Sequence, residues 1–276
     1  MTLRAPSLFL PHGGGPMPLL GDPGHKELIK FLETKARALI VNPRVKAIVV
    51  VTAHWETSPG FVVSTTTKNK LLYDYGGFPK EAYDVSFPAT GSPEIAARVA
   101  SVLTAAGLPI TTDSKRGWDH GVFVPLKLVL GNEWSIPLVS LSVCADQDPA
   151  RHFAMGRALS QLRDEGIAIV GSGMSFHNFA VFRRGFALPP GAKAQPENAP
   201  FHEALAAACA IENVDARAKA FAGWDKWAGA RDSHPVNAAE HFMPLVVTAG
   251  AGGEAKGEEI LTWQMGLARQ GAWVWN

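Results

Sequence analysis

Three of the nine histidines follow apolar runs that have the composition of buried strands. His12 follows SLFLP, His54 follows AIVVVTA, and His177 follows IAIVGSGMSF. Neutral imidazole is a common ligand for zinc, iron and other first-row metals. A single histidine after a strand is more often a hydrogen-bonded loop residue, so the argument depends on three of them at equivalent positions. Together they predict a metal site more strongly than a proton relay alone.

Glycines accompany two of these histidines. Gly13–Gly15 form the run HGGGP, and Gly171 and Gly173 precede His177. Glycine has no Cβ, so the backbone can turn sharply and approach a ligand closely. HGGGP is not a phosphate loop, because it matches neither GxxxxGK[ST] nor GxGxxG. The glycines therefore favour a tight turn beside a bound group.

The remaining histidines divide into candidates and surface residues. His120 stands in WDHG, directly before the helix-like run VFVPLKLVL. The segment HPVNAAEHFMPL adds His234, Glu240 and His241, and the sequence does not decide which of these side chains points inward. The other three lie on or beside helix-like segments, and we expect them at the surface: His25, His152 and His202.

The elements that would position these residues alternate between strands and helices. We expect strands at 7–10, 47–52, 138–143 and 167–170, and helices at about 26–41, 93–106 and 149–164. Such alternation predicts right-handed crossovers and an α/β fold, with a mainly parallel central sheet and helices on both faces. Ligands of open α/β sheets bind at the carboxyl ends of the strands. His12, His54 and His177 are therefore expected to share one pocket there.

The chain is expected to form one catalytic domain over residues 1–276. The stretch 188–200, rich in proline and alanine, is interpreted as a surface loop rather than a linker, because candidate site residues lie on both sides of it. The net charge of +1 gives no basic excess for nucleic acid. No apolar stretch reaches the roughly 18 residues that span a membrane. The chain has only two cysteines, and its N-terminal apolar run is too short for a signal peptide. Both observations favour a cytoplasmic protein.

Several ordered motifs resemble the class III (LigB-like) extradiol ring-cleavage dioxygenases, in the branch similar to DOPA 4,5-dioxygenase. They extend over nearly the whole chain and include LFLPHGGGPM, VVVTAHWET, WDHGVFVPLKLVL, GIAIVGSGMSFHNF and AEHFMPL. The resemblance implies an α/β fold with iron(II) near the strand ends. It also implies a small catechol-type aromatic diol and O2 as substrates.

The resemblance also implies roles for individual residues. His12 and His54 match the two N-terminal metal ligands, and His241 matches the third. His177 matches the acid/base histidine, and His120 matches a second pocket histidine that orients substrate or moves protons. HGGGP replaces the commoner HGSP, and a histidine stands where distant relatives use glutamate. The adjacent Glu240 keeps a carboxylate ligand open, and zinc is an alternative to iron in purified protein.

Two other functions fit the same residue types. One is a zinc hydrolase that uses the same ligands, with Glu56 as its base. The other is a non-catalytic metal-binding or interaction protein, which has no use for His120 and His177 beside the ligands. The residue chemistry barely separates dioxygenase from hydrolase, and the resemblance favours the dioxygenase. Four aromatic residues form either a lid over a substrate ring or ordinary loop packing: Tyr73, Tyr75, Phe78 and Tyr83. The sequence leaves the particular catechol, the position of ring cleavage and the oligomeric state open.

Overall fold

A central sheet of eight strands organises the protein. The computed structural model describes residues 4–189 and 194–276. The strand order is β4-β3-β5-β2-β6-β1-β8-β7. The strands are β1 (Ser7–Pro11), β2 (Ala47–Thr57), β3 (Phe61–Ser64), β4 (Ile110–Asp113), β5 (Leu138–Cys144), β6 (Ile167–Gly173), β7 (Glu258–Met265) and β8 (Ala268–Trp275).

The middle of the sheet is parallel, as the sequence predicted. β2 pairs in parallel with both β5 and β6, and β6 pairs in parallel with β1. All four predicted strands are confirmed, and each continues beyond its predicted end, β2 as far as Thr57. The hairpin of β7 and β8 was not predicted, and it joins the sheet antiparallel to β1. The strands β3 and β4 were not predicted either, and β3 pairs antiparallel with β5. The predicted α/β class is therefore correct, with antiparallel pairing on both sides of the parallel middle.

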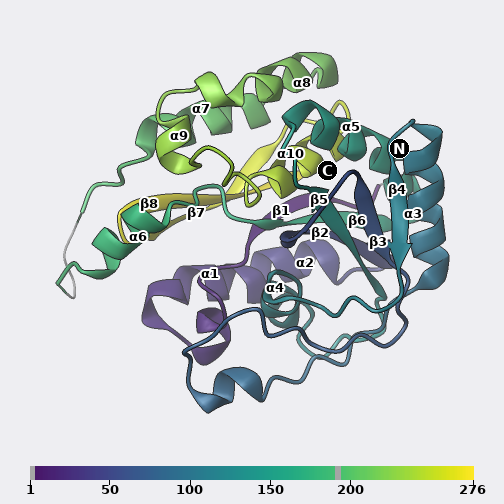
Figure 1. The fold of residues 1–276 in the computed structure, drawn as a ribbon, viewed down its shortest axis with the longest axis horizontal. Coiled ribbons are helices and arrows are strands. Elements are labelled where there is room, and N and C mark those ends of the chain that lie inside the picture. Colours follow the sequence, from purple (N-terminus) through teal and green to yellow (C-terminus); the bar gives the residue numbers. More distant parts are fainter. Residues whose placement is uncertain (1–3, 190–193) are drawn as a thin grey trace.

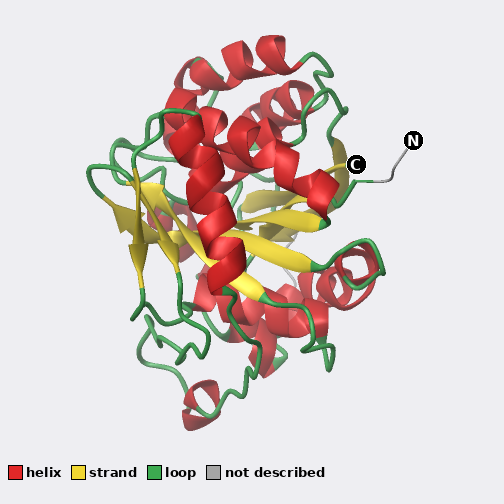
Figure 2. Cartoon of the chain, turned by 90° about the vertical axis from the view of Figure 1, so that its right-hand side faces the viewer, coloured by secondary structure: helices red, strands yellow, loops and turns green. Residues whose placement is uncertain are grey.

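Helices cover both faces of the sheet (Figures 1 and 2). One layer holds α1 (Lys26–Phe31), α2 (Arg37–Ile40) and α4 (His120–Leu130). The opposite layer holds α3 (Pro93–Ala105), α5 (Pro149–Leu159), α7 (Ala199–Cys209), α8 (Val214–Ala222), α9 (Ala230–Ser233) and α10 (Met243–Ala251). Helix α6 (Phe179–Phe186) follows β6 and lies near the hairpin of β7 and β8 (Figure 1).

Strand β2 explains why the fold has two cores. Ile48 and Val50 pack into the core on the α4 side, whereas Val49 and Val51 pack into the core on the α10 side. Successive side chains of a strand point to opposite faces, so an uninterrupted apolar run satisfies both layers at once. The run AIVVVT therefore places β2 in the middle of the sheet, where strand ends are most enclosed.

The predicted helices agree with the structure in position. The segment at 26–41 contains α1 and α2, joined by a π-helical turn over Leu32–Ala36. The segment at 149–164 is α5 followed by a 3-10 turn. Of the loop predicted at 188–200, residues 190–193 lie outside the described residues, and α7 already begins at Ala199. No helix among the described residues is long and apolar enough to cross a membrane. A single domain over 1–276 stays a prediction.

Candidate metal centre

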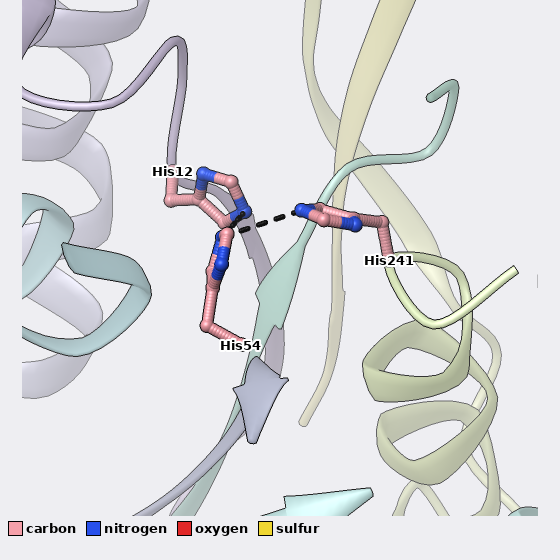
Figure 3. A group of neighbouring side chains, drawn as sticks. All are labelled: His12, His54 and His241. Carbon is pink, nitrogen blue, oxygen red and sulfur yellow. Dashed lines mark hydrogen bonds between the residues drawn. The ribbon is translucent and has the colours of Figure 1, made fainter. Parts of the chain in front are cut away.

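Three imidazoles from three different segments point toward one another (Figure 3). His12 follows β1, His54 belongs to β2, and His241 lies just before α10. The Nε2 atom of His54 is 3.3 Å from Nε2 of His12 and 3.3 Å from Nε2 of His241. The candidate ligand atoms of the three residues all lie within 4.8 Å of one another. This spacing allows all three nitrogens to reach one metal ion.

A bulge in β2 delivers His54 to this point. The sequence placed His54 after the strand, but β2 continues to Thr57. Thr52 pairs with Ser142 and Glu56 with Val143, so the residues between Thr52 and Glu56 leave the regular ladder with β5. Bulges are frequent beside active sites because they redirect a side chain. The imidazole of His54 thus leaves the regular register of the strand.

Gly173, at the end of β6, allows His241 to come close. A Cβ on Gly173 would lie 2.2 Å from the carbonyl oxygen of His241, so no larger residue fits without movement. The same carbonyl accepts a hydrogen bond from the Met174 amide at 3.0 Å. Backbone contact with β6 therefore fixes the position of the third imidazole. Gly173, which precedes His177 in the sequence, is therefore required by the close approach of the His241 backbone.

Each of the three imidazoles has its second nitrogen beside an oxygen. The distances are 2.9 Å from His12 Nδ1 to Gly13 O, 3.3 Å from His54 Nδ1 to Asp74 Oδ2, and 2.7 Å from His241 Nδ1 to Glu240 Oε1. A carbonyl or an ionised carboxylate can only accept a hydrogen bond, so these partners favour a proton on Nδ1. The three Nε2 atoms then carry lone pairs that face one another with no proton between them. A bound cation satisfies this arrangement, and oxygen partners of this kind usually orient metal-ligating histidines.

The electrostatics keep these imidazoles neutral. Burial, and then the charge of neighbouring histidines, lowers the pKa of His54 to about 3. The same two causes lower the pKa of His12 and of His241 well below the usual value. Burial disfavours the charged form of histidine, and only the neutral form coordinates a metal. At neutral pH the nitrogens are therefore available as ligands.

His120 is held beside this group by Asp74. Its Nδ1 lies 2.8 Å from Asp74 Oδ1, and its backbone amide donates to the same oxygen at 3.0 Å. The preceding Asp119 is buried and accepts a hydrogen bond from Thr52 Oγ1 at 2.8 Å, which ties the start of α4 to β2. The imidazoles of His120 and His54 have their ring centres 3.9 Å apart. The motif WDHG therefore positions His120 as the sequence indicated.

His177 completes the group of five. Its imidazole stacks on that of His241 with ring centres 3.5 Å apart and an interplanar angle of 14°. Its Nδ1 is 3.7 Å from Glu240 Oε1, and its backbone amide donates to the carbonyl of Ser233 at 2.9 Å. Burial, followed by the nearby charge of His120, lowers the pKa of His177 to about 4. The ring is therefore neutral at pH 7 and can accept a proton.

All five histidines line one cavity of about 520 Å³. Cavities of about 300–1,000 Å³ are typical of small-molecule sites. The aromatic segment divides between the two roles that the sequence left open. Tyr75 and Phe78 line the cavity, whereas Tyr73 and Tyr83 pack against Tyr75 with ring centres 5.9 and 5.5 Å away.

Three histidines were wrongly expected at the surface. His25, His152 and His202 are all buried. Nε2 of His25 accepts the Gly14 amide at 3.0 Å, and Nε2 of His152 accepts the Cys144 amide at 3.0 Å. Nε2 of His202 lies 2.9 Å from Glu259. Each imidazole connects its helix or turn to another part of the chain, through a backbone amide or a strand side chain. A position on or beside a helix was therefore not enough to predict exposure.

His234 and Glu56 lie apart from the cavity lining in the described structure. His234 is fully buried, and its Nε2 lies 3.0 Å from the carbonyl oxygen of Ser175. Burial lowers its pKa to about 3. Glu56 is exposed and accepts a hydrogen bond from Gln147 at 3.1 Å. His234 is therefore a core residue, and the base required by the hydrolase hypothesis does not face the site.

Asp74 is the site residue that the sequence analysis missed. It stands between Tyr73 and Tyr75, and the prediction for this segment named only the aromatic residues. Its carboxylate contacts both His120 and His54. An acidic residue between aromatic residues in a loop was the available signal, but its partners lie 46 and 20 positions away along the chain.

Comparison with known proteins agrees with this geometry. The family model described as the catalytic LigB subunit of aromatic ring-opening dioxygenase matches residues 6–273. The chain belongs to this family and is an extradiol aromatic ring-opening dioxygenase. It is 44% identical to the dioxygenase tasH of Hapsidospora irregularis, over 94% of this chain and 81% of that protein.

Other relatives extend the comparison. The chain is 35% identical to the 4,5-DOPA dioxygenase extradiol of Beta vulgaris, over 97% of this chain and 95% of the relative. A crystal structure of an uncharacterized protein from Escherichia coli K12 matches with a TM-score of 0.76 and 30% identity, covering 99% of this chain and 100% of the other. The resemblance in the motifs and the α/β fold are thus confirmed.

Proposed function

We propose that this chain is a non-haem iron(II) dioxygenase that opens the ring of a catechol-type diol with O2. The metal ligands are His12, His54 and His241, and the residues that accept and donate protons are His177 and His120. The single observation that carries the proposal is the convergence of three Nε2 lone pairs, each directed by an oxygen at Nδ1. Iron(II) held there would leave positions open for diol and O2 and would supply the redox chemistry that triplet O2 requires.

The protein's own groups bind the diol and move its protons. The five imidazoles occupy one part of the cavity, so a diol bound there has imidazole nitrogen atoms close to both hydroxyl groups. His177 is uncharged at neutral pH and accepts a hydroxyl proton on a ring nitrogen. His120 gives its Nδ1 proton to the hydrogen bond with Asp74, which leaves Nε2 as the atom that exchanges protons. The names of the relatives support extradiol cleavage as the reaction.

The test is anaerobic reconstitution with Fe(II), followed by O2 uptake on a panel of catechols. We expect O2 consumption and a ring-opened product from the iron protein, and none from the same protein loaded with Zn(II), since zinc has no redox role. The hydrolase alternative predicts the reverse: the zinc protein cleaves an ester or amide, and the iron protein consumes no O2. A protein that binds metal but turns over nothing would support the non-catalytic alternative.

A further inference from the structure

The cavity lining has a polar part and an apolar part. The polar part consists of the five imidazoles, Asp74 and Glu240. The rest is mostly glycine, methionine and aromatic side chains, and the aromatic residues are Tyr75, Phe78, Phe179, Phe182 and Phe186. A volume of about 520 Å³ exceeds what a single diol ring needs. The apolar part therefore has room for a substituent carried by that ring.

Helix α6 supplies an aromatic stripe that leads away from the metal centre. Its phenylalanines have the spacing i, i+3, i+7, which places them on one helix face. The ring centre of His177 is 4.9 Å from that of Phe179 and 6.0 Å from that of Phe182, and Phe186 follows Phe182 at 6.2 Å. The stripe begins at a histidine of the proposed site and continues outward along the lining.

Two rings of this stripe are unusually exposed. Phe179 is 64% exposed and Phe186 is 59% exposed, although both line the cavity. Large apolar side chains left in contact with water beside a cavity are typical of a surface that a ligand covers. A flat or chain-like apolar group over these rings would remove their surface, and its own, from water.

The charges of the lining disfavour an ionic substituent. Within residues 4–189 and 194–276, the lining contains no lysine or arginine. Arg184, on α6, is paired with Glu197. The two charged side chains that do line the cavity, Asp74 and Glu240, are both acidic and are held by imidazoles. A substrate carboxylate would lose its hydration without gaining a cation. An ammonium over phenylalanine and methionine would gain only the attraction of aromatic faces, about 0.5–2 kcal/mol, which is less than the hydration it loses.

From these observations we infer that the ring of the catechol substrate carries an uncharged, apolar substituent, which lies against Phe179, Phe182 and Phe186. The inference rests on the proposed function, because it takes the diol to be bound at the histidines. It names the substrate class that this particular lining selects: alkyl- or aryl-substituted catechols rather than catechol acids or catechol amines.

Binding of matched probes to the Zn(II)-loaded protein tests this without turnover. Calorimetry under anaerobic conditions compares 4-(3-methylbutyl)catechol with its carboxylate isostere 3-(3,4-dihydroxyphenyl)propanoate, and 4-propylcatechol with its ammonium isostere dopamine. We expect the neutral member of each pair to bind at least about tenfold more tightly. In the series from 4-methyl- to 4-butylcatechol, affinity should rise by about fourfold per added methylene.

Charge variants at the stripe give a second, independent measurement. Phe179→Arg places a cation on the lining at an exposed position, so it should tighten binding of the propanoate and weaken that of the alkyl probe. Phe179→Leu keeps the site apolar and should retain the original preference. Val236→Arg is the matched control, because Val236 is 68% exposed and is not among the lining residues of the described structure. It adds the same charge and should leave both affinities unchanged.

Each outcome has a defined meaning. Equal or tighter binding of the propanoate or dopamine overturns the inference, as does an alkyl series of constant affinity. If no probe binds, both the inference and the proposed function are overturned. If the alkyl preference holds but the iron protein consumes no O2 with any probe, the substituent inference stands and the proposed dioxygenase reaction with these catechols is refuted.

Discussion

Glu240 offers the sharpest test of how the metal centre is held. The sequence left open whether Glu240 or His241 is the third ligand, and the structure places Glu240 Oε1 2.7 Å from His241 Nδ1. The carboxylate can only accept at this position, so it keeps the proton on Nδ1 and the lone pair on Nε2. In Glu240→Gln the amide can also donate to Nδ1, which moves the proton to Nε2 and blocks coordination.

The size of the effect follows from this one contact. A hydrogen bond to a charged group contributes about 1.5–3 kcal/mol, and loss of an orienting partner of a metal ligand usually costs roughly 10- to 100-fold in metal affinity. We therefore expect Glu240→Gln to bind one metal ion per chain, with a Kd raised by roughly that factor. If Glu240 were itself the ligand, the variant would lose stoichiometric metal.

Competition with a chromophoric chelator, using Zn(II) or Co(II), measures the Kd directly. Glu203→Gln is the matched control, because the same substitution is made on an exposed side chain of α7 outside the lining of the described structure. Its Kd should equal that of the wild type. Unchanged metal affinity in Glu240→Gln would refute the role of the carboxylate in setting the protonation of His241. Complete loss of the metal would show that Glu240, and not His241, is the third ligand.

Three further predictions concern single histidines. His12→Ala and His54→Ala should each lose tight metal binding and activity while the fold persists, and full metal occupancy measured by elemental analysis would remove that residue from the ligand set. His177→Ala should keep its metal and lose about 10²- to 10⁴-fold in kcat, with a smaller loss for His120→Ala; wild-type kcat in His177→Ala contradicts its catalytic role. His152→Gln tests pH dependence: burial lowers the His152 pKa to about 4, so the unfolded chain takes up a proton from about pH 6.5 downward and the folded protein does not. The free energy of unfolding should therefore fall as the pH drops from about 6.5 to about 4, by roughly 3 kcal/mol more in the wild type than in the variant. Urea unfolding at several pH values measures this, and an equal fall in both proteins would contradict the prediction.

Sequence was sufficient for the parts of the fold that local patterns determine. The runs that became β2, β5 and β6 are apolar and β-branched, so their strand character is set by residues next to one another in the chain. Right-handed crossovers between such strands predict a parallel sheet, whereas the order of the strands comes from the structure. From these elements it was possible to expect His12, His54 and His177 in one crevice, and the structure brings them there.

The missed features depend on partners that are distant in the chain. The proton on His120 is directed by Asp74, and the position of His25 is determined by the Gly14 amide. No periodicity encodes such pairs, because each depends on how two loops meet after folding. The hairpin of β7 and β8 is different: Trp263 and Met265 are buried, while the glutamates at the start of β7 are more exposed. This alternation is visible in the sequence and is typical of a strand with one buried face.

The geometry of the centre arises from departures from regular structure rather than from the regular elements themselves. The imidazole of His54 lies with the side chain of Thr52 against Gly121 at the start of α4, where a Cβ on Gly121 would come within 2.9 Å of both. The bulge after Thr52 releases the residues that follow from the regular ladder with β5. The missing side chain at Gly173 lets the chain before α10 touch β6. A parallel sheet gathers its strand ends at one edge, and both irregularities lie where Nε2 of His54 comes to 3.3 Å from the other two imidazoles. The oxygen beside each Nδ1 then sets the direction of the ring, so the protein's own contacts orient the three Nε2 atoms toward one shared point.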